Sequence, residues 1–361
     1  MANVNFDQSG VAYFDSFPNQ WPSTRVSEYF PRIDSKGSRY AMLWADSSGS
    51  GEHLGGVYSI REEPTIDLNG DRLIDGLWRD AISGSVVGTL YNAIGDVCCT
   101  RSLGGNSDWS IGSPGDFDGD GVTDFLWLQE STGLAVLRLN NADGSAKAAV
   151  ITGESTDWEL AGSGDYDGDG KTDVVWRHKD FGFNVMWLFD GLSHPRQAPI
   201  GGDPVWHLVA ADHDFDVNGD GRTDLIWRQA TTGVNIIKRM NGFNEISATV
   251  LPGGGSDWEI VATGDYDADG SSDVLWRQAS TGTVLQWRLV DAVFQQSAWM
   301  GGSLDWSVVG SEDADGDGRS DLLWRQASTG VTVLRLAGGT SIILGGDRNW
   351  SFLRRPGRQV G

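Results

Sequence analysis

The 361-residue sequence is poor in the features that mark several common protein classes. Its two cysteines, Cys98 and Cys99, are adjacent, so they can neither cross-link distant segments nor supply the spaced thiols of a zinc site. Whether these two thiols are reduced or joined stays open. No apolar run approaches the roughly 20 residues that span a bilayer. Residues 1–10 lack the basic start and apolar centre of a signal peptide. We therefore expect no membrane insertion.

Basic residues are also scarce. Lys and Arg total 27 against 50 Asp and Glu, which gives a formal net charge of −23. Binding to a nucleic acid needs a basic surface, so this balance argues against a nucleic-acid partner. Glycine, in contrast, is abundant at 50 residues, and 17 Trp accompany a hydrophobic fraction of 39%. Such a chain can bury a core, but one that many turns interrupt.

An internal repeat determines the predicted fold. An acidic segment, for example GDYDGDGKTDVVWRHKDFG from Gly164, recurs about every 49 residues. The first aspartates of its copies are Asp67, Asp116, Asp165, Asp216, Asp265 and Asp313. Each copy contains four short strand patterns, and the tryptophan that ends the second pattern occurs seven times, at Trp44, Trp78, Trp127, Trp176, Trp227, Trp276 and Trp324. The repeat is typical of an all-β propeller of four-stranded blades.

We predict a seven-bladed β-propeller that forms a single domain over residues 1–361. Residues 1–59 form an N-terminal segment with a degenerate blade, residues 60–348 form six regular repeats, and residues 349–361 form a closing strand and tail. An open ring would leave strand edges unpaired. We therefore expect residues 349–353 to pair with the N-terminal blade and close the ring.

The acidic loops have the pattern of metal sites. Carboxylates stand at positions 1, 3, 5 and 9, a glycine at position 6 allows a sharp turn, and the position 7 carbonyl is a further candidate ligand. Solvated turns are the alternative for a single copy, but six copies in register favour up to six Ca²⁺ sites. The predicted ligands are Asp116, Asp118, Asp120 and Asp124; Asp165, Asp167, Asp169 and Asp173; Asp216, Asn218, Asp220 and Asp224; Asp265, Asp267, Asp269 and Asp273; Asp313, Asp315, Asp317 and Asp321; and Asp67, Asn69, Asp71 and Asp75.

The last of these loops is expected to be the weakest site, because Arg72 replaces the glycine at position 6. The loops end in Asp and enter a strand, which distinguishes them from EF-hands. With its repeat of about 49 residues, the D-x-D-x-D-G-x-x-D loop resembles the FG-GAP/VCBS repeats of integrin-α-like β-propellers. The resemblance covers roughly residues 26–355 and implies calcium between the first two strands of a blade. Similar propellers include integrin-like adhesion heads and some lectins, so the resemblance also implies a binding function.

A variable position within the repeats suggests a ligand-binding surface. Eleven residues after the second-strand tryptophan, the copies carry Arg138, Trp187, Lys238, Trp287 and Arg335. Exposed Trp and Arg side chains stack on sugars and hydrogen-bond their hydroxyls, which predicts several weak, equivalent carbohydrate sites. The alternative is that these side chains only cover the edges of the blades.

No catalytic residue is predicted. His213 is flanked by two carboxylates, but no Walker loop, nucleophile elbow or zinc-protease helix is present. The favoured function is a calcium-stabilised module that binds carbohydrate or a glycoprotein. The alternatives are an integrin-like protein-binding scaffold and a polysaccharide lyase. Open calcium loops of this kind suit millimolar calcium, which favours an extracellular or periplasmic location.

Overall fold

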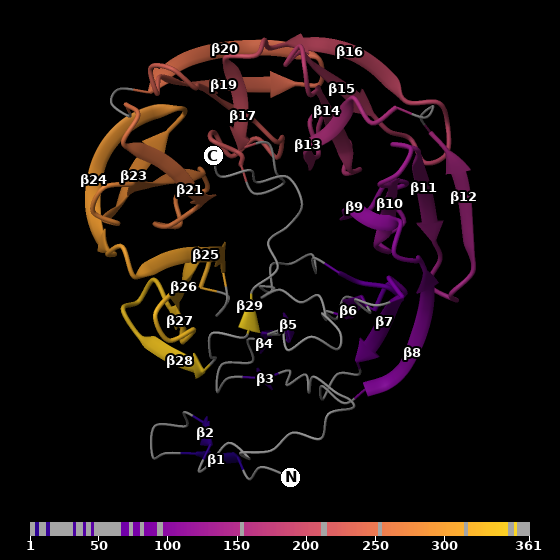
Figure 1. Cartoon of the computed structure of the whole chain (residues 1–361), viewed down its shortest axis with the longest axis horizontal. Coiled ribbons are helices and arrows are strands. Elements are labelled where there is room, and N and C mark those ends of the chain that lie inside the picture. The colour runs from indigo at the N-terminus through magenta and orange to yellow at the C-terminus, as the bar shows by residue number, and fades with distance from the viewer. Residues whose placement is uncertain are drawn as a thin grey trace.

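The chain forms antiparallel sheets arranged around a ring in the computed structural model (Figure 1). The structure describes residues 66–71, 75–79, 83–91, 97–151, 155–210, 215–251, 255–313, 317–345 and 350–351, and the backbone of five short strands before residue 47. Within this part of the chain, no helix is long and apolar enough to cross a lipid bilayer.

Five sheets have four strands each, and consecutive strands pair from the inside of the ring to its rim. The first is β9 (Trp109–Gly115), β10 (Asp124–Gln129), β11 (Ala135–Asn140) and β12 (Ala146–Val150). The second is β13 (Trp158–Gly164), β14 (Asp173–His178), β15 (Asn184–Leu188) and β16 (Arg196–Gly201). The third is β17 (Trp206–Ala210), β18 (Leu225–Gln229), β19 (Asn235–Asn241) and β20 (Asn244–Leu251). The fourth is β21 (Trp258–Gly264), β22 (Asp273–Gln278), β23 (Val284–Val290) and β24 (Val293–Gly301). The fifth is β25 (Trp306–Glu312), β26 (Asp321–Gln326), β27 (Thr332–Arg335) and β28 (Ser341–Gly345).

The remaining strands form smaller sheets. A three-stranded sheet contains β6 (Gly76–Arg79), β7 (Val86–Tyr91) and β8 (Val97–Gly104). Three two-stranded sheets pair β1 (Val4–Phe6) with β2 (Ala12–Phe14), β3 (Arg32–Ile33) with β4 (Arg39–Tyr40), and β5 (Ala45–Asp46) with β29 (Trp350–Ser351). The last pair joins the two ends of the chain, with Trp350 opposite Asp46.

The prediction of seven four-stranded blades is therefore wrong, because the described part of the chain forms five. The sheet of β6–β8 has three strands, and the strand expected near Ile60 lies outside the described residues. In the first copy, Ala41 stands three residues before Trp44, where every later copy has an aspartate. In those later copies this aspartate ties the loop to the third strand by hydrogen bonds, as shown below. Without it, the N-terminal strands form separate pairs instead of one blade.

The hydrophobic core lies between neighbouring sheets. Strand β10 is buried along Asp124–Trp127, and strand β11 alternates buried and half-buried residues. The outer strand β12 is mostly exposed. Each core cluster combines side chains from two adjacent sheets, as where Trp227 packs with Tyr166 and Met186. A second strand that is apolar on both faces follows from this packing, because a neighbouring blade covers each face.

Candidate metal centre

The acidic loops join the first and second strands of each four-stranded sheet, the Asp67 loop precedes β6, and the loops are hydrogen-bonded to one another in series. The position 8 residue donates its backbone N–H to the carbonyl of the first aspartate in the preceding loop. Thr172 donates to Asp116 at 2.6 Å and Thr223 donates to Asp165 at 2.7 Å. The same bond links Thr123 to Asp67, Ser272 to Asp216 and Ser320 to Asp265. All six loops therefore lie on the same face of the ring.

The first aspartate organises its own loop. Both carboxylate oxygens of Asp116 accept backbone N–H groups, from Gly119 at 2.7 Å, Asp120 at 3.2 Å and Gly121 at 2.8 Å. The turn needs glycine at position 4 as well as position 6, because Gly119 and Gly121 both have φ of 80°. The sequence prediction included only position 6. In one loop Ala268 occupies position 4 with φ of 62°, which is strained for a residue with a Cβ.

The ninth aspartate fastens the loop to the third strand. The Asp124 carboxylate is fully buried and accepts the N–H of Phe117 at 2.9 Å and of Asn140 at 2.7 Å, one at each oxygen. Asp173 and Asp224 make the equivalent pairs of bonds. Burial raises the pKa of Asp124 and of Asp173 to about 8, although these backbone donors act in the opposite direction. Burial also raises the pKa of Asp224 to about 7.

The third position distinguishes a metal site from an ordinary turn. The Oδ1 atoms of Asp118, Asp167, Asn218 and Asp267 are buried and receive no hydrogen bond from any described residue. A buried oxygen without a donor is costly, and its repetition in four loops calls for a common partner. A divalent cation is such a partner, because calcium takes six to eight oxygen ligands.

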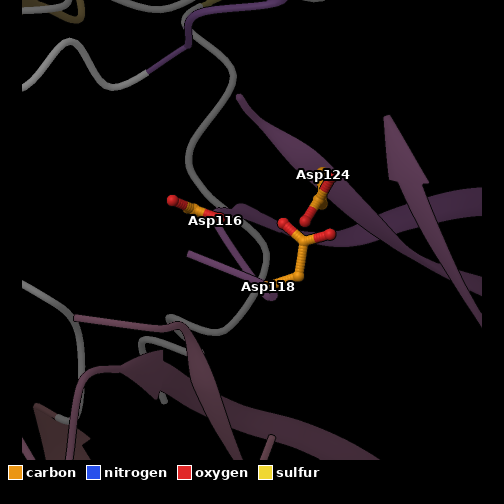
Figure 2. A group of neighbouring side chains, drawn as sticks. All are labelled: Asp116, Asp118 and Asp124. Atoms are coloured by element: carbon orange, nitrogen blue, oxygen red, sulfur yellow. The ribbon is translucent and has the colours of Figure 1, made fainter. Parts of the chain in front are cut away.

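Carboxylates converge at this position. Ligand oxygens of Asp116, Asp118 and Asp124 lie within 4.8 Å of one another, and Figure 2 shows the carboxylates of Asp118 and Asp124 facing each other. The Asp165 loop brings positions 1, 3 and 9 together in the same way, whereas the Asp265 loop brings together positions 1, 3 and 5. Burial raises the pKa of Asp118, and the charges of Asp120 and Asp116 add to the shift. These carboxylate oxygens fit a hard cation, which would offset the repulsion between their negative charges.

The other predicted ligands are less converged. Asp120 and Asp169 are exposed and lie outside these three-residue groups. In the Asp67 loop, the amide of Asn69 is used inside the turn, with Nδ2 donating to Asp71 at 3.0 Å and Oδ1 accepting from the Asp71 N–H at 3.1 Å. In the last loop, Asp313 accepts two loop N–H groups, but Asp315 lies outside the described residues.

Three loops have an arginine beside the candidate ligands, and in the Asp216 loop this is Arg222, which lies 3.3 Å from Asp220. Arg288 ion-pairs with Asp267 and, at 3.1 Å, with Asp269, so a guanidinium partly neutralises that loop. Arg196 lies 2.5 Å from Asp167. Among the described residues, no ion pair involves the carboxylates of the Asp116 loop. The Asp116 loop therefore offers the least compensated group of charges.

The five predicted carbohydrate-binding residues lie on the third strands, at the seams between blades. Trp187 is half-buried against Trp176, with 6.0 Å between ring centroids, and Trp287 packs on Trp276 at 5.1 Å. Arg138 donates to the carbonyl of Leu103 in the preceding sheet.

The remaining two members also have partners within the protein. Lys238 pairs with Glu245 at 2.8 Å and lies over the ring of Trp227. Arg335 is exposed and donates to the carbonyl of Met300 at 2.7 Å. The five residues occupy five different sheets and do not form one patch, so their role in sugar binding stays a prediction.

The sequence reasoning missed a set of arginines that follow the second-strand tryptophan. Arg177 donates to the carbonyls of Gly182 and Trp206, both at 2.8 Å, and so connects its own turn with the next sheet. Arg228 connects its turn with the following sheet in the same way. The recurring Trp-Arg pair was the available signal. His213, the histidine flanked by two carboxylates, lies outside the described residues.

Comparison with known proteins identifies the repeat. A model of the FG-GAP-like repeat matches residues 116–176 and 216–276. This chain contains FG-GAP-like repeats. Each matched stretch begins at the first aspartate of one acidic loop and ends at the second-strand tryptophan of the next copy. The FG-GAP-like repeats therefore include four of the candidate metal loops. No curated protein sequence matches the chain.

Several solved structures are similar in fold. An oligogalacturonate lyase in complex with manganese superposes with a TM-score of 0.53 at 9% identity, over 88% of this chain and 84% of that one. The oligogalacturonate lyase of Vibrio parahaemolyticus gives a TM-score of 0.48 at 9% identity, with 88% and 85% covered. Prolyl oligopeptidase B of Galerina marginata gives 0.49 at 9% identity, with 89% and 50% covered. At 9% identity, the similarity to the manganese complex shows a shared fold alone.

Proposed function

We propose that this chain is a calcium-stabilised β-propeller binding module whose ligand is a carbohydrate. The buried third-position oxygen that has no donor, repeated in four loops, carries the calcium part of the proposal. Calcium suits the site because it prefers oxygen ligands, and the loops bring carboxylate oxygens together and place the Asn218 amide oxygen at the same position in one loop. Loops of this open type favour millimolar calcium, which supports a location outside the cytosol.

Calcium would hold the ring together through the loops. Each loop's first aspartate organises the turn, its ninth aspartate binds the third strand, and its position 8 residue binds the preceding loop. A cation that bridges positions 1, 3 and 9 would therefore stabilise the contact between strands as well as the loop. Binding at about tenfold above the dissociation constant contributes about 1.4 kcal/mol per site.

The ligand part of the proposal has support from the surface and the charge. Phe181 is 63% exposed, and an aromatic face exposed to this extent suits the C–H face of a sugar ring. The acidic surface disfavours polyanions. A neutral ligand with many hydroxyl groups, such as a sugar, can stack on an exposed aromatic ring and is not repelled by the acidic surface.

A glycan array probed with saturating calcium and again with excess chelator tests the proposal. We expect calcium-dependent binding to a defined group of glycans, since the chelator weakens the loops that order the ring. Binding to none of the glycans in calcium would contradict the carbohydrate part. Unchanged thermal stability in chelator would contradict the calcium part.

A protein-binding scaffold is the second candidate, and a regular feature of the outer strands favours it. Equivalent positions on four outer strands carry exposed apolar side chains, at Val150, Val250, Trp299 and Ile343. Surface apolar groups of this kind favour protein contacts. A chain that binds no glycan but binds proteins through these positions would support the scaffold. A lyase activity stays a prediction of the sequence.

A further inference from the structure

One turn at the face opposite the acidic loops differs from its counterparts in three other sheets. In those sheets, the turn between the second and third strands is held by a Gln, Ser and Thr network around an aspartate. In the first sheet, Asp108 accepts Gln129 Nε2 at 2.8 Å and Ser131 Oγ at 2.6 Å, and Gln129 Oε1 accepts from Thr132 at 2.7 Å. The fourth and fifth sheets repeat this network around Asp257 and Asp305.

The β14–β15 turn replaces this polar network with aromatic rings. His178, Asp180 and Phe181 stand where the first, fourth and fifth sheets have Gln, Ser and Thr. The imidazole of His178 lies 4.6 Å from the ring of Phe181 and is stacked on Phe183 at 5.2 Å. Trp158 packs edge-on against His178 and Phe183, each at 5.1 Å. The blade architecture does not require these rings, because three other sheets form the same turn without them.

The turn also has free hydrogen-bonding capacity. Asp157, the counterpart of Asp108, is exposed, and the one side-chain donor that reaches it among the described residues is Ser155 Oγ, at 3.1 Å. The Nδ1 of His178 faces the N–H groups of Asp180 and Phe181 at 3.3 and 3.4 Å, which places the ring proton on Nε2. Asp157 is joined to the turn by the N–H of Lys179, which donates to its backbone carbonyl at 2.7 Å, and Asp180 directly precedes Phe181, whose side chain is 63% exposed.

We propose that the β14–β15 turn is a saccharide-binding site in which Phe181 stacks on the sugar ring and Asp157 accepts its hydroxyl protons. The proposal rests on the carbohydrate-binding function proposed above and adds a location and a ligand class. A pyranose has an apolar side, which can stack on an aromatic ring, and hydroxyl groups, which can donate hydrogen bonds to a carboxylate.

The charges at the turn determine the class of sugar. Asp157 and Asp180 repel a carboxylated sugar, and the cation of Lys179 is engaged with the carbonyl of Thr156 at 2.7 Å. The site therefore takes neutral or amino sugars and excludes uronic and sialic acids.

The experiment converts the turn to the version found in the other sheets. The triple variant His178→Gln, Asp180→Ser and Phe181→Thr should fold as the wild type does, because the same residues form this turn elsewhere in the ring. Trp299→Ala is the control, since it removes an equally exposed aromatic side chain from an outer strand. Both variants and the wild type are tested in calcium on immobilised neutral, amino and acidic glycans, and by titration with the best monosaccharide.

We expect wild type and Trp299→Ala to bind the same neutral or amino sugars, and the triple variant to lose at least tenfold in affinity. Full binding by the triple variant would overturn the site but leave the carbohydrate function standing. Binding confined to acidic sugars would overturn the ligand class. If wild type binds no glycan, both the function and the site are wrong. Should the triple variant unfold, the single change Phe181→Thr decides the question by the same criteria.

Discussion

Replacing Asp118 with asparagine should change the stability of the ring in opposite directions with and without calcium. Without a cation, the Asp118 carboxylate has oxygens within 4.8 Å of those of Asp116 and Asp124, and its buried Oδ1 has no donor among the described residues. Two charges at about 5 Å repel by about 1 to 3 kcal/mol, depending on the effective dielectric. Because Asp118 is half-buried, we expect a gain of about 1 kcal/mol in chelator. Asn218 occupies the same position in another loop, so an amide fits there.

With calcium bound, the same change removes a charged ligand. Affinity in such loops depends on the number of charged ligands, and a roughly tenfold loss lowers stability by about 1.4 kcal/mol at saturating calcium. This loss outweighs the gain of about 1 kcal/mol, so the net effect in calcium is a loss of about 0.4 kcal/mol, and the two conditions should differ by about 1.4 kcal/mol.

The assay is urea unfolding of wild type and variant, once in saturating calcium and once in excess chelator. The control is Asp180→Asn, which makes the same chemical change on an exposed turn away from the acidic loops. The control should have effects of the same sign and size in both conditions. If Asp118→Asn shifts stability in the same direction in both, the carboxylates do not converge on a cation and the reasoning is refuted.

Three further changes test other parts of the loops. Asp124→Asn should lower stability by about 1.4 kcal/mol in calcium, because it removes a charged ligand, and should change it little in chelator at pH 7, where a pKa of about 8 leaves the buried carboxyl largely protonated; urea unfolding with an equal loss in both conditions would contradict this. Ala268→Gly should stabilise the chain by about 0.5 kcal/mol. The strain energy removed at the positive φ exceeds the free energy lost because glycine raises the conformational entropy of the unfolded chain. A lower melting temperature would contradict this. Arg288→Leu should tighten calcium binding roughly tenfold at one site, because it frees Asp267 and Asp269; an unchanged calorimetric titration would show that the guanidinium does not compete.

The repeat made much of the structure predictable. A period of about 49 residues, with one apolar strand between an acidic loop and a glycine turn, predicts four strands per sheet and their order. The turn between the second and third strands needs a glycine. At Gly133 the φ is 76°, and a Cβ would lie 2.0 Å from the carbonyl oxygen of Ser155. The number of complete blades was not predictable from the tryptophan count, because Trp44 is retained in a copy that lacks the ninth aspartate.

The loops were predicted at the level of residue type but not of role. The pattern identified Asp118 and Asp124 as equivalent ligands, whereas the structure gives Asp124 two backbone donors and leaves Asp118 Oδ1 with none among the described residues. Such roles depend on which strand each oxygen faces. Variability alone suggested that Trp187 is exposed, yet it is half-buried, because the seam next to Trp176 tolerates different side chains.

The most direct test of the central claim is a crystal structure determined in saturating calcium, with anomalous data collected to locate the ions. The account predicts a peak in the Asp116 loop within about 2.3 to 2.6 Å of Asp118 Oδ1, and equivalent peaks in the Asp165 and Asp265 loops. Well-ordered loops without anomalous density at these oxygens would contradict it.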